Sequence, residues 1–539
     1  MTYAAPPTSS IIEISTLIHW LRLQTEAGKA ALATRLTEWT AAPASLERTR
    51  QQANHLQKVL QTDPTLYPEL RSHFTAIAAI EKEVTPLLTA PSDLERETYG
   101  ELLFLRPLLQ PLNSLPFLLP FWSFLRIYLL PGLSLLLPLL TLLAPYFILK
   151  YVLCIPITFT NYITLLHSLL SGQFMDPATC SSSASSSPSG LTHPTSLLKQ
   201  LAIILVTVIQ GIVQPYWTYH HLSTVGSTMD GLGRHLMELR TRYEILHARL
   251  SPLGLPLRPC PLPALRSLPH AVSEALLHPN YFRLALKYLG TLEVHLQLLH
   301  HPSVHPVKWV SSPTPQFHLQ DTYDIHIPSA TPATPATPAT PVPVPFTVTL
   351  GGSDAPRHAL LTGPNKGGKS TILRSVALSA LLAHTYGCAI GHLTATPFHS
   401  LYVCLKPDDL PGTKSRFERE IEFTAQTLRP HSGPVLVLLD ELYHSTNPPD
   451  ALSSCIHYSN RLWKSPSAVS VISTHLFEWV EQSEPAIVQR LCCPAYYDKS
   501  GTLQFTYKLH PGICRVSSVD LLLRQNGLLP SPPFVTPSE

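Results

Sequence analysis

The sequence predicts an α/β fold of the phosphate-loop type near its C-terminal end, preceded by a mainly α-helical region that carries an apolar hairpin. Three observations lead to this prediction. A glycine-rich loop at 362–371 lies between an apolar strand and a helix-forming stretch, a second apolar strand ends in two adjacent carboxylates, and residues 107–175 contain almost no charge. With 539 residues, the chain has room for two to four domains.

Residues 1–106 read as helical, because apolar side chains recur at helical spacing among charged ones over 45–60 and 69–88. No basic segment followed by an apolar core opens the chain, so a secretory signal is not expected. The 9 cysteines form no Cys-x-x-Cys pair, which predicts neither a zinc site nor a disulfide framework and suits a reducing compartment. The net charge of only +3 gives no argument for nucleic acid.

The only charged residues in the segment 107–175 are Arg126 and Lys150. Between them, 127–149 is long enough to cross a bilayer, which takes about 20 residues, and 151–175 can supply a second crossing. We therefore expect a transmembrane hairpin, with the protein membrane-associated inside the cell and its C-terminal domain on the cytosolic or nuclear side. The alternative is a buried helical core broken by prolines, which membrane helices tolerate better than soluble ones.

The rest of the chain divides by composition. Another apolar run, 201–213, is too short to cross a membrane and is expected to form a packed helix. Serine-rich and Thr-Pro-Ala segments predict extended connections. The predicted organisation is a helical region (1–106), the apolar hairpin (107–175), a Ser/Pro linker (176–198), a helical lever or core-like region (199–328), a Pro/Ala/Thr spacer (329–345), the α/β domain (346–530) and a tail (531–539).

The glycine-rich loop satisfies the Gly-x-x-x-x-Gly-Lys-Ser pattern, with a predicted strand at 358–361 before it and a predicted helix at 370–382 after it. Glycines let the backbone wrap a phosphate chain, and the N–H groups at the helix start face the anion. Lys369 is expected to reach the outer phosphates, and the Ser370 hydroxyl to ligate Mg²⁺. The loop residues expected to bind a nucleoside triphosphate are Gly363, Pro364, Asn365, Gly367, Gly368, Lys369, Ser370 and Thr371.

Two further segments supply polar groups that such a site needs. The apolar strand 435–439 is followed by Asp440, expected to hold Mg²⁺, and by Glu441, expected to orient and deprotonate the attacking water. Another strand, 469–474, delivers His475 to the same carboxyl edge of a parallel sheet, where it can sense the γ-phosphate.

These motifs resemble those of the MutS mismatch-repair ATPases. The loop TGPNKGGKST differs from the family's TGPNMGGKST only at Lys366, residues 408–420 are similar to the family's DDLxxGxSTFxxE, and 474–478 look like its THxxEL motif. The resemblance implies that Ser415 completes the ATP site of a partner subunit. It therefore implies a homodimer or a MutS-like heterodimer.

The resemblance covers about 346–530 and implies a MutS domain V-like, ABC-type ATPase domain that uses ATP and Mg²⁺. It places Phe346 and Tyr507 where the family has aromatic rings that stack on adenine. One loop departs from the family: 443–451 stands where MutS proteins have GRGTSTxDG, at their dimer interface. The first hundred residues show no counterpart of the mismatch-reading domain, so direct mismatch recognition is not expected.

Three functions remain open from the sequence. The first is a membrane-tethered MutS-like ATPase that hydrolyses ATP at a composite dimer site to move helical levers, with sequence-independent contact to duplex DNA left open. The second is an ABC-type membrane ATPase, against which the chain has no Leu-Ser-Gly-Gly-Gln signature. The third is an ATP-binding scaffold without DNA binding, against which the intact Lys369, Ser370, Asp440, Glu441 and His475 argue.

Overall fold

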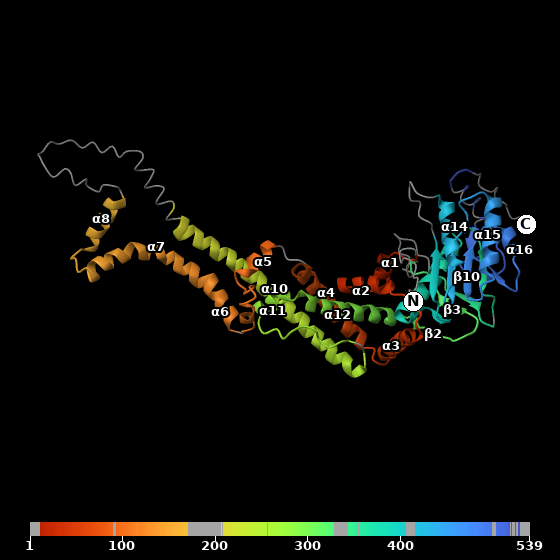
Figure 1. The fold of residues 1–539 in the computed structure, drawn as a ribbon, viewed down its shortest axis with the longest axis horizontal. Coiled ribbons are helices and arrows are strands. Elements are labelled where there is room, and N and C mark those ends of the chain that lie inside the picture. The colour runs from red at the N-terminus through yellow and green to blue at the C-terminus, as the bar shows by residue number, and fades with distance from the viewer. Residues whose placement is uncertain are drawn as a thin grey trace, which may run out of the picture. The chain divides into compact units, whose positions relative to one another are not determined.

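The computed structural model describes residues 11–89, 93–115, 117–170, 206, 209–255, 257–327, 343–353, 355–405, 415–498, 503–517, 519, 523 and 526–528 (Figure 1). The chain divides into two compact units. The first comprises Met1–Ala79, Tyr243–Cys260 and Ala285–Glu539, and the second comprises Ile80–Arg242 and Pro261–Leu284.

A six-stranded sheet forms the centre of the first unit. Its strands follow the order β14 (His510–Pro511), β11 (Val488–Cys492), β5 (His358–Thr362), β10 (Ala468–Ser473), β9 (Val435–Leu439) and β8 (Ser400–Cys404). All neighbours are parallel except the pair β14 and β11. Every residue of β5, β9 and β10 is buried, as expected for apolar strands of a parallel sheet covered on both faces. The predicted α/β fold is therefore confirmed.

The helices of this domain pack closely around the sheet (Figure 1). They are α13 (Lys369–Tyr386), α14 (Arg416–Thr427), α15 (Pro448–Leu462) and α16 (Phe477–Gln482). Cys455 and Tyr458 of α15 and Trp479 of α16 share one apolar cluster with β9. This apolar cluster fixes β9 and β10 in place, so that the polar residues at and after their carboxyl ends have fixed positions.

The same unit contains a second, four-stranded sheet. Its order is β2 (Lys308–Trp309), β7 (His392–Ala395), β3 (Gln316–Thr322) and β4 (Phe346–Gly351). Three of these strands precede the phosphate loop in the sequence, while β7 follows it. Two short pairs join β1 (Val304–Pro306) with β6 (Cys388–Ile390) and β12 (Ala495–Tyr497) with β13 (Leu503–Phe505). Phe346 opens β4 and is buried.

The helical part of the first unit contains α1 (Ile14–Leu21), α2 (Glu26–Leu36), α3 (Pro43–Thr62) and the beginning of α4 (Leu66–Thr89). Thr25 caps α2 by accepting a hydrogen bond from the Gly28 N–H at 2.9 Å. The buried Glu293 carboxylate of α12 (Pro279–His300) accepts hydrogen bonds from the Gln24 N–H at 2.6 Å and from the Thr25 hydroxyl. A Cβ added at Gly290 would overlap the backbone of Ala27, so α12 and α2 meet at a glycine. The helices predicted over 45–60 and 69–88 are confirmed.

The second unit is helical wherever the structure assigns it regular secondary structure. It contains α5 (Asp93–Gly100), the 3₁₀ turn η2 (Gln110–Ser114), α6 (Leu118–Phe124), the π-helical turn η3 (Leu125–Leu129), α7 (Leu130–Phe147), the π-helical turn η4 (Ile148–Val152), α8 (Phe159–Leu170), the π-helical turn η5 (Ile209–Val213), most of α10 (Gln214–Leu250), α11 (Leu268–Leu277) and the start of α12. From α6 to η4 these segments follow one another directly, although the stretch contains prolines. Wide π-type turns accommodate the carbonyl groups that proline leaves without a donor.

One helical stretch among the described residues, Leu118–Leu136, is long and apolar enough to cross a membrane by length and composition. The second crossing expected over 151–175 is not a continuous helix, since the chain leaves the helical conformation after Val152 and α8 has only 12 residues. Residues 171–175 of that expected crossing lie outside the described residues, as do the linker 176–198 and positions 329–342 of the spacer.

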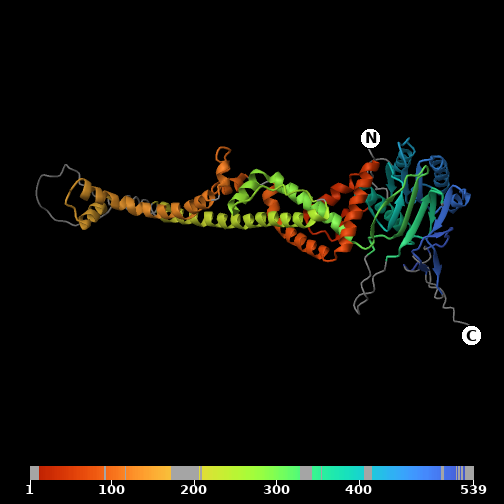
Figure 2. The same cartoon turned by 90° about the horizontal axis from the view of Figure 1, so that it is seen from below.

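The apolar helix is paired instead with the beginning of α10, which runs antiparallel to it (Figure 2). A Cβ at Gly226 would lie 3.0 Å from Ile127 Cδ1, the rings of Tyr219 and Tyr128 lie 5.9 Å apart, and η5 packs against α7. Of the packed helix expected over 201–213, η5 contacts α7 and Gly211 is buried, whereas Val206, Ile209, Ile212 and Val213 are exposed. The alternative of a buried proline-broken core does not fit most of the described part, since Leu119, Ile127, Tyr146 and Tyr162 are buried but most of its other large apolar side chains are exposed.

Candidate nucleotide-binding site

The phosphate loop joins the end of β5 to the start of α13, as the sequence predicts. Gly363 and Gly368 have φ angles of 149° and 102°, which favour glycine, and Gly368 is the N-cap of α13. A Cβ on Gly363 would lie 3.0 Å from the Cys493 carbonyl oxygen. Lys366, where the family has Met, also adopts a left-handed conformation, with φ 67°. The loop therefore presents its backbone as a cradle rather than side chains.

Lys369 lies folded over this cradle. Its ammonium donates hydrogen bonds to the carbonyl oxygens of Gly363 at 2.9 Å and of Pro364 at 3.3 Å, and its side chain is buried. Burial lowers the pKa of Lys369, while the nearby carboxylates of Glu441 and Asp440 oppose that shift. An incoming phosphate can replace the carbonyl partners with stronger charge-assisted hydrogen bonds.

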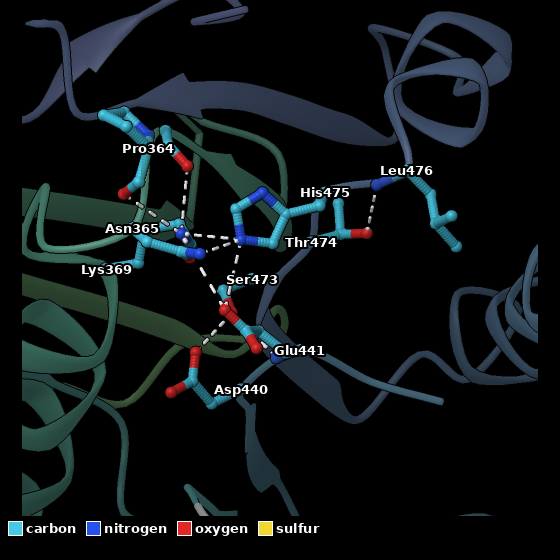
Figure 3. A network of polar contacts seen from close by, with 10 residues as sticks. Pro364, Asn365, Lys369, Asp440, Glu441, Ser473, Thr474, His475 and Leu476 are labelled. Carbon is cyan, nitrogen blue, oxygen red and sulfur yellow. Dashed lines mark hydrogen bonds and ion pairs between the residues drawn. The ribbon is translucent and has the colours of Figure 1, made fainter. Parts of the chain in front are cut away.

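Asp440 and Glu441 follow the end of β9 and are held by Ser473 of β10 (Figure 3). The Ser473 hydroxyl donates to Asp440 Oδ1 and accepts from the Glu441 N–H at 2.9 Å. Glu441 has a φ angle of 50°, unusual for a non-glycine residue. This backbone conformation turns the Glu441 side chain toward the phosphate loop.

His475 connects the two halves of the site (Figure 3). Its Nε2 atom lies 3.1 Å from Lys369 Nζ, 3.1 Å from Glu441 Oε1 and 3.0 Å from Asn365 Oδ1. The hydrogen bond from His475, followed by the charge of Lys369, lowers the pKa of Glu441 despite its partial burial. A carboxylate kept ionised in this way is suited to orient water and accept its proton.

A cavity of about 320 Å³ lies beside these groups. Its wall contains nine of the predicted site residues: Phe346, Pro364, Asn365, Gly368, Lys369, Ser370, Thr371, Glu441 and Tyr507. Ile327 and Val344 add apolar surface next to Phe346. The cavity therefore has a cationic, glycine-rich end for phosphates and an apolar, aromatic end for a base.

Gly363, Gly367, Asp440 and His475 adjoin the cavity wall through the loop and the polar network without lining it. The predicted metal ligands Ser370 and Asp440 offer hydroxyl and carboxylate oxygens, which are the donors that Mg²⁺ prefers. Ser473 donates a hydrogen bond to Oδ1, one of the two carboxylate oxygens of Asp440. The hydroxyl and carboxylate oxygens of Ser370 and Asp440 therefore fit the ion.

Ser415 lies at the N-cap of α14. Its hydroxyl accepts a hydrogen bond from the Glu418 N–H at 3.2 Å, and the Glu418 carboxylate accepts one from the Ser415 N–H at 2.8 Å. This reciprocal capping box orients the first turn of α14. Ser415 does not line the cavity of its own chain, and residues 408–414 of the same motif lie outside the described residues.

Two contributors to the site were missed from the sequence. Ser473 was included in the strand prediction, but its contact with Asp440 depends on the pairing of β10 with β9. Asp324 also lines the cavity, and its buried carboxylate binds Arg374 of α13 at 3.0 Å and His326 at 2.6 Å. An Asp and an Arg 50 positions apart carry no recognisable spacing, so only the fold reveals the pair.

The comparison with known families agrees with this geometry. The family model for MutS domain V matches residues 359–529, which include the phosphate loop, the Asp440–Glu441 pair, His475 and Tyr507. MutS domain V is an α/β domain of the phosphate-loop ATPase type, which is the fold observed here. Over residues 359–529 the chain is therefore similar to MutS domain V in both sequence and fold.

Proposed function

We propose that the chain is a MutS-like ATPase, which binds ATP with Mg²⁺ and hydrolyses it at a composite dimer site to move its helical levers. The observation that carries this proposal is the convergence of Lys369, Glu441 and His475 at one end of a cavity with aromatic residues at the other. Phe346 and Tyr507 would enclose the adenine, since aromatic rings stack on bases.

In the proposed reaction, a water oxygen forms a bond to the γ-phosphorus, and the bond to the β–γ bridging oxygen breaks with its electron pair leaving on ADP. Glu441 orients that water and accepts its proton, which the lowered pKa of Glu441 favours. Lys369 and the loop N–H groups hold the phosphates, and His475 bridges Glu441 to Asn365 of the loop. Mg²⁺, held by Ser370 and Asp440, supplies neutralisation of phosphate charge when bound.

The composite site rests on Ser415, which caps α14 and does not line the cavity of its own chain. Glu441→Ala should stop hydrolysis while keeping ATP bound, so the variant should form an ATP-dependent dimer in analytical ultracentrifugation. Adding Ser415→Ala should weaken that dimer. A monomer that retains ATP would contradict the composite site and favour the ATP-binding scaffold.

Contact with duplex DNA belongs to the same proposal, as sequence-independent binding to phosphates. ATP turnover should rise when duplex DNA is added, and the increase should disappear at higher salt. Equal stimulation by matched and mismatched duplexes is expected. Turnover indifferent to any duplex would point to levers that grip another partner.

The second part of the proposal is a tether to a membrane through the antiparallel pair formed by residues 118–152 and the beginning of α10. Arg126 and Lys150 are the only charged residues in 118–152, and Leu133 and Leu136 are each 53% exposed. Ile209 and Ile212 of η5 and Tyr216 and Trp217 of α10 are exposed as well. Water disfavours so extensive an apolar surface, whereas lipid accepts it.

Vesicle flotation of the full chain tests this tether. The wild-type chain should float with phosphatidylcholine vesicles at high salt, because the contact is apolar rather than electrostatic. Leu133→Asp with Leu136→Asp should abolish flotation. The control is Ile245→Asp, which places one such charge at an exposed apolar position further along α10 and should float normally. Equal flotation of all three proteins, or none by the wild type, would overturn the tether.

The ABC-type alternative draws support only from features that both classes share. The family match over 359–529 favours the MutS-like function, and no separate observation favours transport.

A further inference from the structure

The loop after Glu441 is the part of the domain that departs most from the MutS pattern. Tyr443 stands where the resemblance places the first glycine of GRGTST. It nevertheless keeps a backbone that favours glycine, with φ 58°. A bulky residue is strained in this conformation and persists only where its surroundings hold it. Tyr443 must therefore gain contacts that offset the strain.

Those contacts come from α14. The Tyr443 side chain is buried, and its ring packs edge-on against Phe417 at 5.7 Å between centroids. Its hydroxyl oxygen lies 2.7 Å from Thr424 Oγ1. Thr424 already donates its single hydroxyl proton to carbonyl oxygens of its own helix at 2.9 Å, so Tyr443 is the donor.

The same helix carries Ser415 at its N-cap, and Tyr443 lies two positions after Glu441. The Glu441 carbonyl also accepts a hydrogen bond from the His444 N–H at 3.2 Å, which closes the turn containing Tyr443. A closed turn and a buried ring therefore connect Glu441 to α14.

We propose that Tyr443 is a positioning residue that ties the Glu441 loop to α14, so that the nucleotide state of one chain's site sets the placement of the Ser415 it offers to its partner. This inference rests on the proposed composite site. The Tyr443 side chain acts beside the hydrogen bonds that the Tyr443 backbone and Ser445 make to Glu420 of the same helix.

The chain contains a matched control for this pair. Tyr458 of α15 is as buried as Tyr443, and its hydroxyl lies 2.8 Å from Oγ1 of Thr427, which like Thr424 belongs to α14. Thr427 donates to the Thr424 carbonyl, so Tyr458 is likewise the donor. The two pairs have the same chemistry, but Tyr458 belongs to a regular helix and has no turn joining it to Glu441.

The experiment compares Tyr443→Phe with Tyr458→Phe in the full chain. Both should lower the melting temperature similarly, because each loses one buried hydrogen bond. Only Tyr443→Phe should reduce kcat at unchanged KM for ATP, and only it should weaken the ATP-dependent dimer of the Glu441→Ala background. A buried hydrogen bond corresponds to roughly a three- to tenfold change in such an equilibrium.

Thr424→Val should reproduce the effect of Tyr443→Phe, and the double variant should add little, because both remove the same bond. Equal effects of Tyr443→Phe and Tyr458→Phe on the dimer, or no effect of either, would overturn the inference while leaving the composite site intact. A wild-type chain that hydrolyses ATP without any ATP-dependent dimer in the Glu441→Ala background would instead overturn the composite site, and the inference with it.

Discussion

Removing the Ser473 hydroxyl is the perturbation whose consequences the structure defines most closely. The Ser473 side chain is fully buried at the end of β10. Its hydroxyl serves both carboxylate residues, donating to Asp440 Oδ1 and accepting from the Glu441 N–H at 2.9 Å. Ser473→Ala removes both hydrogen bonds with little change in volume. It leaves the Glu441 N–H, in its left-handed backbone conformation, without this acceptor.

The expected magnitude is the sum of two contributions. A neutral hydrogen bond contributes about 0.5–1.5 kcal/mol to stability, and one to a charged group about 1.5–3 kcal/mol. Ser473→Ala should therefore lower the free energy of unfolding by about 2–4.5 kcal/mol. Because Glu441 and Asp440 lose their shared support, kcat should fall by about 10- to 100-fold, in keeping with small misplacement of a catalytic group.

Urea unfolding and ATP turnover of the same preparation measure the two effects. Ser470→Ala is the control, since Ser470 is equally buried on β10 and its hydroxyl bonds only His358 Nδ1 at 2.9 Å. That variant should lose about 1 kcal/mol and keep its kcat. Indistinguishable kcat values for Ser473→Ala and the wild type would refute the assigned role of Ser473.

Three further predictions follow from the site and its supports. His475→Ala should raise the pKa of Glu441 toward its ordinary 4.5, because it removes the largest cause of the lowering. The stability that ionised Glu441 contributes is complete above pH 4.5 and is lost as pH falls through the lowered pKa of the folded state. Acid unfolding of the variant should therefore lack this contribution to stability, and an unchanged acid transition would contradict the assignment. Phe346→Ala should raise KM for ATP by about fivefold or more through lost stacking while leaving inhibition by tripolyphosphate unchanged, and equal loss of both would place Phe346 elsewhere. Gly290→Ala should lower the melting temperature, because its methyl group would overlap the Ala27 backbone, and a variant as stable as the wild type would show that α12 and α2 separate readily.

The candidate nucleotide-binding site was predictable because its groups lie next to strongly patterned segments. The buried strands that end at Thr362, Leu439 and Ser473 are mostly apolar. The polar residues that follow these strands therefore meet at one edge of a parallel sheet. The sequence thus predicted Lys369 and His475 near the same ligand edge, and the structure adds that Lys369 Nζ and His475 Nε2 lie 3.1 Å apart.

What the sequence did not reveal depends on pairings between distant segments. Ser473 contacts Asp440 only because β10 pairs with β9 in one register. The partner of the apolar helix was misplaced, because hydropathy reports length and composition but not which helix lies alongside. Nothing in the local pattern around Tyr443 indicates that a tyrosine would keep the backbone conformation of a glycine.

The central claim is that this chain hydrolyses ATP at the site built around the phosphate loop. The most direct measurement is release of inorganic phosphate from ATP by the purified full chain, beside Lys369→Ala and Glu441→Ala. The account predicts steady turnover by the wild type, loss of both nucleotide binding and turnover in Lys369→Ala, and retained ATP without turnover in Glu441→Ala. Wild-type protein that binds ATP without releasing phosphate, or Glu441→Ala with undiminished turnover, would contradict it.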